Sequence, residues 1–314
     1  MSDQPAEHMQ CMEVWGGSQL TARGVEFGGL DAWVYSKPYG KAHAGGDVYY
    51  ASSCATGRIS RLLLADVAGH GQTVAATAAD LRTLMRRFVN RLDQGEFVRI
   101  LNQQFSALPR TGAFATAVVT TFFEPTGRLT VCNAGHPRPM LYRAAQRQWD
   151  FLGAIENAPA AKKVAGPSNI PLGLYDAAEY EQFDIELEPG DCLLSYTDAL
   201  IESRDADGEM LGEDGLLRIV RVLGDVAPDK MIETLLAEIE ARYPENLSED
   251  DVTVLVVRAN GRRLRHPFRE KLRALGRGIG AFLRGEPAPF PDLKIANVGG
   301  AIIPALGRFW RARR

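Results

Sequence analysis

The sequence has few cysteines and no long apolar run. Its four cysteines are too far apart along the chain to form a metal knuckle or a redox pair: Cys11, Cys54, Cys132 and Cys192. We therefore expect reduced thiols in a reducing compartment. No uninterrupted apolar stretch is long enough to span a bilayer, and the amino terminus lacks the basic start and apolar core of a secretory signal. These absences predict a cytoplasmic protein.

The charges are unevenly distributed along the 314 residues. Residues 262–314 contain 13 of the 36 basic residues and three of the 39 acidic ones, a net charge of +10, whereas residues 1–261 carry −13. The change in the sign of the net charge near residue 262 predicts two parts of the chain that bind different partners. We expect a short N-terminal extension over residues 1–29, a folded domain over residues 30–260 and a basic tail over residues 261–314.

The tail has an apolar stripe at helical spacing among its basic residues, formed by Leu264, Phe268, Leu272, Leu275, Ile279 and Phe282. Such a helix can pack on the acidic body, lie peripherally on an anionic membrane surface, or dock on a partner or a second copy of the chain. Packing on the body is favoured because the body is acidic. A nucleic-acid binder is a rival hypothesis, but the body has no basic, aromatic-studded face, so no nucleic acid is expected.

The hydrophobic periodicity changes several times along the chain. Strands are predicted over residues 30–36, 46–53, 58–66, 114–123, 129–133, 140–143, 180–187, 191–196 and 252–257, and helices over 74–92, 97–105, 213–224 and 228–242. Residues 154–169 have the composition of a loop. Strand clusters joined by short turns imply antiparallel pairing, and paired helices imply outer layers. The order predicts an α+β fold with two packed antiparallel β-sheets flanked by helices on the outside.

Acidic residues stand where predicted apolar strands meet turns. Asp47 opens one strand, Asp66 ends the next, Asp198 follows a third, and Asp250 and Asp251 precede the last. A carboxylate near the core is costly unless it is paired or bound to a metal, and carboxylate oxygen is the ligand of hard cations such as Mg²⁺ and Mn²⁺. A single aspartate in such a place is more often a turn or cap residue, and the spacing alone leaves both readings open.

Six motifs occur in a fixed order: Gly45-Gly46-Asp47, Ala65-Asp66-Val67-Ala68-Gly69-His70-Gly71, Asn133-Ala134-Gly135-His136-Pro137, Pro171-Leu172-Gly173-Leu174, Tyr196-Thr197-Asp198-Ala199 and Asp250-Asp251-Val252-Thr253. Together they resemble the SpoIIE-like branch of the metal-dependent protein phosphatase (PPM) family, relatives of the type 2C phosphatases. The resemblance covers roughly residues 30 to 258. It implies a β-sandwich flanked by helices, with a centre for two divalent cations, Mn²⁺ or Mg²⁺, at one end.

The resemblance also implies a role for each matching residue. Asp66 is similar to the acid that bridges both cations, and the main-chain carbonyl of Val67 is an adjacent ligand. Asp47 lies on the far side of the site and acts directly or through water. Asp198 and Asp250 are ligands of one cation, with Asp251 as the second choice for the last position.

The implied activity is hydrolysis of phosphoserine or phosphothreonine on a regulatory partner protein, such as an anti-sigma-factor antagonist, by a water bridging the two cations. That reaction needs no cysteine nucleophile. A structural role in a turn is favoured over proton donation for both His70 and His136. The alternative is a pseudophosphatase that binds partners without turnover. It rests on Ala199, which stands where the family usually has glycine and which disfavours a left-handed backbone.

Overall fold

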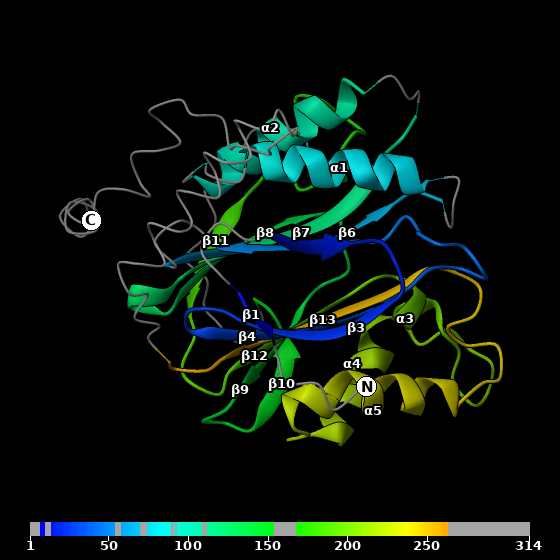
Figure 1. Cartoon of the computed structure of the whole chain (residues 1–314). Helices are drawn as coiled ribbons and strands as arrows, with labels where there is room; N and C mark the ends of the chain where they lie inside the picture. Colours follow the sequence, from blue (N-terminus) through cyan, green and yellow to red (C-terminus); the bar gives the residue numbers. More distant parts are fainter. Residues whose placement is uncertain are drawn as a thin grey trace.

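The computed structural model describes residues 7–9, 14–53, 58–69, 74–88, 91, 93–108, 112–153 and 168–262. In them two β-sheets pack face to face, and helices cover both outer faces (Figure 1). The predicted α+β sandwich is confirmed. His70 and all but the first two residues of the predicted tail lie outside the described ranges, so the expectations for them stay predictions.

One sheet has six strands, and all its neighbours pair antiparallel. Its spatial order is β11 (Gln182–Glu186), β8 (Arg128–Ala134), β7 (Ala115–Phe123), β6 (Ile59–Val67), β5 (Val48–Ser53) and β2 (Val14–Gly17).

The other sheet has seven strands. Its pairs are antiparallel except for the two-residue strand β1, which runs parallel to β3. Its order is β1 (Glu7–His8), β3 (Thr21–Glu26), β4 (Leu30–Lys37), β13 (Val252–Ala259), β12 (Cys192–Tyr196), β9 (Met140–Arg143) and β10 (Gln148–Phe151).

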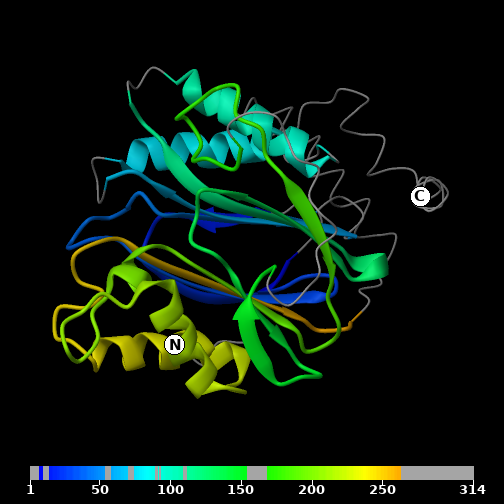
Figure 2. The same cartoon turned by 180° about the vertical axis from the view of Figure 1, so that it is seen from behind.

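The helices form the two outer layers (Figures 1 and 2). Helices α1 (Ala75–Phe88) and α2 (Gln94–Ser106) cover the six-stranded sheet, and α4 (Gly212–Leu223) and α5 (Pro228–Glu240) cover the other. The short helix α3 (Ala199–Glu202) lies at one end of the sandwich, and a 3-10 turn, η2 (Glu124–Thr126), joins β7 to β8. Within the described ranges, none of the helices has the length and apolar character needed to cross a membrane.

Strand β6 shows why the chain forms layers. Leu62 and Leu64 are buried in the core between the two sheets, whereas Leu63 and Ala65 are buried under α1 and α2. Successive side chains of a strand point to opposite faces, so a run that is apolar at every position has both faces covered. Asp66 continues the row of Leu62 and Leu64, which places it at the end of the inter-sheet core.

The segment expected to be an extension, residues 1–29, contributes to both sheets. Strand β2 pairs with β5, and β3 pairs with β4 along its whole length. This corrects the expected start of the domain at residue 30. The sequence gives little signal there because β3 is half-exposed and mixes charged with apolar residues, so pairing with β4 is what orders it.

Arg61 ties the first helical layer to its sheet. Its side chain is 2% exposed, its Nε donates to Thr121 Oγ1 at 2.9 Å, and Nη2 donates to the Arg91 carbonyl at 2.6 Å. The guanidinium also lies 4.4 Å from the ring centre of Phe97 in α2. Burial lowers its pKa to about 10. The cation therefore stays charged at neutral pH and holds the α1–α2 connection against β6 and β7.

We expect Arg61→Met to lower the free energy of unfolding by about 2–3 kcal/mol, because the carbonyl of Arg91 and the hydroxyl of Thr121 lose a buried donor. Urea unfolding measures the change. Arg218→Met, on the exposed face of α4, is the matched control and should leave stability nearly unchanged. Equal stability of the two variants would show that Arg61 does not support this layer.

Candidate metal centre

The predicted acids meet at one end of the sandwich. In the six-stranded sheet, Val48 is paired with Ala65, so Asp47 and Asp66 lie at the same edge. In the other sheet, Tyr196 is paired with Val254, so Asp198 after β12 and Asp250 before β13 share an edge. Helix α3, which follows Asp198, lies at the right-hand end of the sandwich in Figure 1.

Thr197 joins the two edges. Its hydroxyl donates to Asp47 Oδ2 at 2.9 Å and accepts from the Thr253 amide at 2.9 Å, while its own amide donates to the Thr253 carbonyl at 3.0 Å. Thr197 is fully buried and Asp47 is 3% exposed. One hydroxyl therefore connects a carboxylate of the six-stranded sheet to the backbone of the seven-stranded sheet, and this sets the distance between the acids of the two sheets.

Each acid makes ionisation of its neighbours less favourable. Burial, followed by the charges of Asp198 and Asp250 and then of further acids, raises the pKa of Asp66 to about 8. Burial and the charge of Asp66 hold the pKa of Asp47 well above its usual range, although hydrogen bonds from Thr253 and Thr197 oppose the shift. In the described part of the chain, neither Asp47 nor Asp66 forms an ion pair with a lysine or arginine.

Glu202 is an acid of this cluster that the sequence analysis missed. It lies on α3, four residues after Asp198, and its charge raises the pKa of Asp198, second only to burial, and contributes to the raised pKa of Asp66. Residues four apart on a helix share a face. That spacing was the available signal, but a four-residue helix has too little periodicity to be recognised from sequence.

The fit of this centre to cations rests on charge. Among the described residues, no three acidic, histidine or cysteine side chains already lie close enough together to enclose one ion. The carboxylates are nevertheless near enough to shift each other's pKa upward, and oxygen ligands of this kind suit hard divalent cations, which keep water molecules in their coordination shell. Either protons or cations must offset the repulsion.

Asp251 and Asp250 have different environments. Its carboxylate accepts hydrogen bonds from the amides of Tyr39, at 2.6 Å, and Gly46, at 2.7 Å, and it is 3% exposed. Asp250 is half-buried, and its Oδ1 accepts from the Asp251 amide at 2.7 Å. Asp251 thus holds the loop that carries Asp47, whereas the Asp250 side chain is the more accessible of the two.

The two glycines before Asp47 are required by close contacts. A Cβ atom on Gly45 would lie 2.2 Å from Asp251 Oδ1, and one on Gly46 would lie 2.8 Å from the carbonyl oxygen of Val67. The Val67 carbonyl, the main-chain ligand predicted by resemblance, is therefore at the same end of the sandwich as the acids. Any side chain at position 46 would crowd it.

His136 has a structural environment. Its amide donates to Asn133 Oδ1 at 2.8 Å, and Asn133 Nδ2 donates to the His136 carbonyl at 2.9 Å. Its Nδ1 lies 2.8 Å from the hydroxyl of Thr116, which is opposite Asp66 in β7. Burial lowers the pKa of the ring to about 3. The imidazole is thus neutral near pH 7, which agrees with the predicted role in a turn.

Ala199 has a helical backbone. It is the first residue of α3 and is 7% exposed, and the non-glycine residues with positive φ in the described ranges are Arg147, Asn169 and Leu247. Alanine is well suited to this position, so the feature that favoured a pseudophosphatase loses its physical basis.

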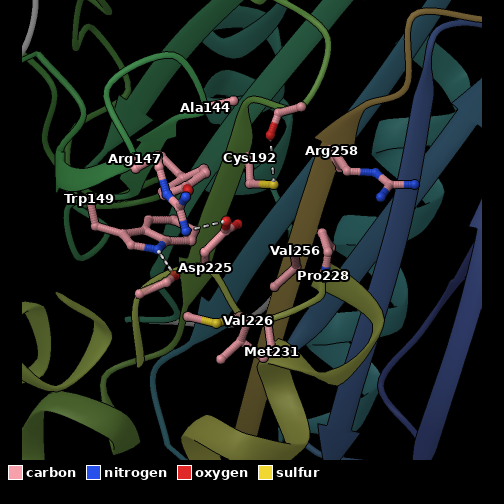
Figure 3. Close-up of a pocket in the computed structure, with 13 residues that line it drawn as sticks. Ala144, Arg147, Trp149, Cys192, Asp225, Val226, Pro228, Met231, Val256 and Arg258 are labelled. Atoms are coloured by element: carbon pink, nitrogen blue, oxygen red, sulfur yellow. Dashed lines mark hydrogen bonds and ion pairs between the residues drawn. The ribbon is translucent and has the colours of Figure 1, made fainter. Parts of the chain in front are cut away.

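The described cysteines are poor nucleophiles. Burial raises the pKa of both Cys132 and Cys192 to about 12, so each stays a thiol near neutral pH. Cys192 lines a cavity of about 400 Å³ together with Trp149, Met231 and Arg258 (Figure 3). This cavity lies beside the start of β12 and the end of β13, which are the opposite ends of these strands from Asp198 and Asp250, so it is separate from the acids.

The chain was compared with known proteins. A model of the stage II sporulation protein E (SpoIIE) family matches residues 57–260. Among solved structures, the RsbU and RsbW domains of Rv1364c from Mycobacterium tuberculosis are 23% identical, with a TM-score of 0.59 over 85% of this chain and 72% of that one. The PP2C phosphatase domain with a regulatory fragment of SpoIIE from Bacillus subtilis is 18% identical, with a TM-score of 0.57 over 80% and 64%. RsbX in complex with magnesium is 15% identical, with a TM-score of 0.53 over 76% and 99%. These structures share the fold.

Replacing the two neighbouring acids separately should distinguish their roles. We expect Asp251→Ala to lower the free energy of unfolding by about 2–4 kcal/mol, because the buried Gly46 amide and the Tyr39 amide lose their acceptor, and Asp250→Ala to lower it by about 1 kcal/mol. Urea unfolding without metal near pH 6 measures both. A larger loss for Asp250→Ala would contradict the structural role of Asp251.

The stability of the metal-free protein should depend on pH. The pKa of Asp66 rises from an ordinary 3.8 to about 8 on folding, so the folded state holds more protons and loses stability as pH rises from about 4 to 8. We expect a lower melting temperature at pH 8 than at pH 5.5 in a chelator. Asp66→Asn, which cannot ionise, should show a smaller difference, and an equal slope in both proteins would be the contrary result.

Proposed function

The chain belongs to the SpoIIE family, within the PPM-type phosphatases, and we propose that it is a metal-dependent protein serine/threonine phosphatase. The observation that carries this proposal is the convergence of Asp47, Asp66 and Asp198 at one end of the inter-sheet core, where burial and then the charge of a neighbouring acid raise the pKa of each. Folding brings like charges together at a free-energy cost, and bound divalent cations would offset it. The shared fold with PP2C phosphatase domains supports the same reading.

We propose that the centre holds two divalent cations, Mn²⁺ or Mg²⁺. Asp66 would bridge them, the Val67 carbonyl would be an adjacent ligand, and Asp198 and Asp250 would hold one of them. Asp47, fixed by the Thr197 hydroxyl, would act from the opposite sheet directly or through water. The magnesium complex of RsbX supports a divalent cation, and the accessible Asp250 fits the ligand role better than Asp251, whose oxygens already accept two amides.

The reaction is the hydrolysis of a phosphate monoester to an alcohol and inorganic phosphate. When bound, the cations supply a water of lowered pKa for in-line attack and positive charge for the phosphoryl oxygens. The protein's own contribution is to hold Asp66 beside the other acids at the end of the core and to hold Asp47 in place through Thr197. His136 is neutral and faces Thr116, so it does not supply the proton of the leaving alkoxide.

The proposed substrate is a phosphorylated regulatory protein, such as an anti-sigma-factor antagonist. The similarity to the RsbU and RsbW domains of Rv1364c supports a role among regulators of this kind. The peptide that carries the phosphate would approach the acids from the open end of the sandwich.

Asp66→Ala is the direct test of the proposal. We expect it to abolish Mn²⁺ binding measured by calorimetry and to lower phosphate release from a phosphoserine peptide by at least about 100-fold. Asp229→Ala, at an exposed position in the first turn of α5, should change neither. Full activity of the wild-type protein in a chelator would exclude the proposed mechanism.

A further inference from the structure

We propose that exposed apolar side chains around the acids form a docking surface for a folded phosphoprotein. We call this set the apolar rim: Leu20, Tyr39, Leu174, Tyr175 and Met210. The inference rests on the proposed function and goes further, because it names a second part of the substrate, an apolar surface next to the phosphorylated residue, and the residues that would bind it.

The apolar rim accounts for most of the exposed large apolar side chains in the described ranges. Leu20 is 71% exposed, Met210 60% and Leu174 56%. The one other member of this class, Val222, is 83% exposed and lies near the end of α4, two residues before Gly224, which lines the cavity at the opposite end of the seven-stranded sheet. Single exposed apolar residues are ordinary, but their concentration at the end that holds the acids is a sign of an interaction site.

On the Asp47 side, two rim residues are connected to the centre by the backbone. The amide of Tyr39 donates to the Asp251 carboxylate at 2.6 Å. Leu20 is in the turn between β2 and β3, and the carbonyl of Ser18 in that turn accepts from the Gly45 amide at 2.8 Å. Leu20 therefore stands on a turn that is bonded to the loop before Asp47, and Tyr39 is bonded to Asp251, which also accepts from the Gly46 amide.

On the side of β6 and β7, Leu174 and Tyr175 follow Leu172, which exchanges two backbone hydrogen bonds with Ala115, at 2.7 and 2.9 Å. Ala115 is paired with Val67 in the adjacent strand. The buried Asn102 of α2 fixes this loop, because its Oδ1 accepts from the Gly173 amide at 2.8 Å and its Nδ2 donates to the Tyr175 carbonyl at 2.8 Å.

Met210 completes the apolar rim next to α3. The segment after α3 folds back on itself. The Leu211 amide donates to the Ser203 carbonyl at 2.8 Å, and Met210 forms an isolated antiparallel β-bridge with Arg204. Helix α3 begins directly after Asp198. The apolar rim thus draws on loops from both sheets and stands on more than one side of the acids.

This placement favours a folded protein as the occupant. A phosphate that reaches the acids must bring its carrier over the surrounding loops, and a small phosphate ester would not extend to side chains on separate loops of both sheets. Aromatic residues and methionine are enriched in protein interfaces, where a few of them contribute most of the binding free energy. The partner is therefore expected to carry apolar side chains beside its phosphorylated serine or threonine.

The test compares two substrates on two variants. The double variant Leu20→Ser/Leu174→Ser alters the apolar rim on two sides of the acids, and Val222→Ser is the matched control at an equally exposed apolar position. Each is assayed with Mn²⁺ on p-nitrophenyl phosphate and on a phosphorylated anti-sigma-factor antagonist. For the double variant we expect kcat/KM on the phosphoprotein to fall by at least about tenfold, mainly through KM, and hydrolysis of the small ester to stay at the wild-type rate.

The outcomes separate this inference from the proposed function. If the wild-type protein hydrolyses neither substrate with Mn²⁺, the proposed function fails. If it hydrolyses the ester but not the phosphoprotein, or if the double variant and Val222→Ser act equally on the phosphoprotein, the docking surface is refuted.

A change of the double variant from dimer to monomer in sedimentation, with phosphoprotein hydrolysis unchanged, would assign the apolar rim to self-association. Faster hydrolysis of both substrates by the double variant would assign it to an inhibitory contact within the chain. Either result overturns the proposal.

Discussion

The hydrogen bond from Thr197 to Asp47 is the contact on which the arrangement of the acids depends. Each sheet can be built from its own strand pairs, but only a contact between the sheets decides how close the two sets of carboxylates come. Thr197 makes such a contact, beside that of Asp251 with the Gly46 amide, and is also bonded in both directions to Thr253. A buried hydroxyl shared among three groups has little freedom to move. The acids are held near one another against their repulsion, which bound cations or protons would offset.

The layers of the sandwich follow from the same rule that places the acids. In β6, β5 and β13, alternate side chains form the inter-sheet core, and Asp66, Asp47 and Asp251 continue those rows beyond the last apolar residue. The polar site is therefore the end of the hydrophobic core. Its loops are anchored from beneath by buried groups such as Asn102 and Asp251, so they can present exposed side chains in fixed positions.

Much of this could be predicted from sequence because the strong signals are local. The apolar run of β6 and the periodic spacing in α1 and α5 predict their elements within a few residues. The resemblance favoured Asp250 over Asp251 as the ligand, but the structural role of Asp251 could not be predicted, since it depends on amides of Tyr39 and Gly46 that are more than 200 residues away. Glu202 was missed because its significance depends on the position of Asp66 in another sheet. Strands β2 and β3 were missed because pairing, not composition, orders them.

The hydrogen bonds of this end of the molecule have a consequence for the order of synthesis. Thr197 and Asp47 are 150 residues apart, and the bonds of Asp251 to Gly46 and Tyr39 close loops of 205 and 212 residues. Chain segments that are so distant meet late, and a ribosome releases the amino-terminal acids well before β13 exists. Until β13 is inserted between β4 and β12, the seven-stranded sheet is divided and the loop before Asp47 lacks its contact with Asp251. The nascent polypeptide therefore cannot assemble the centre before β13 has left the ribosome.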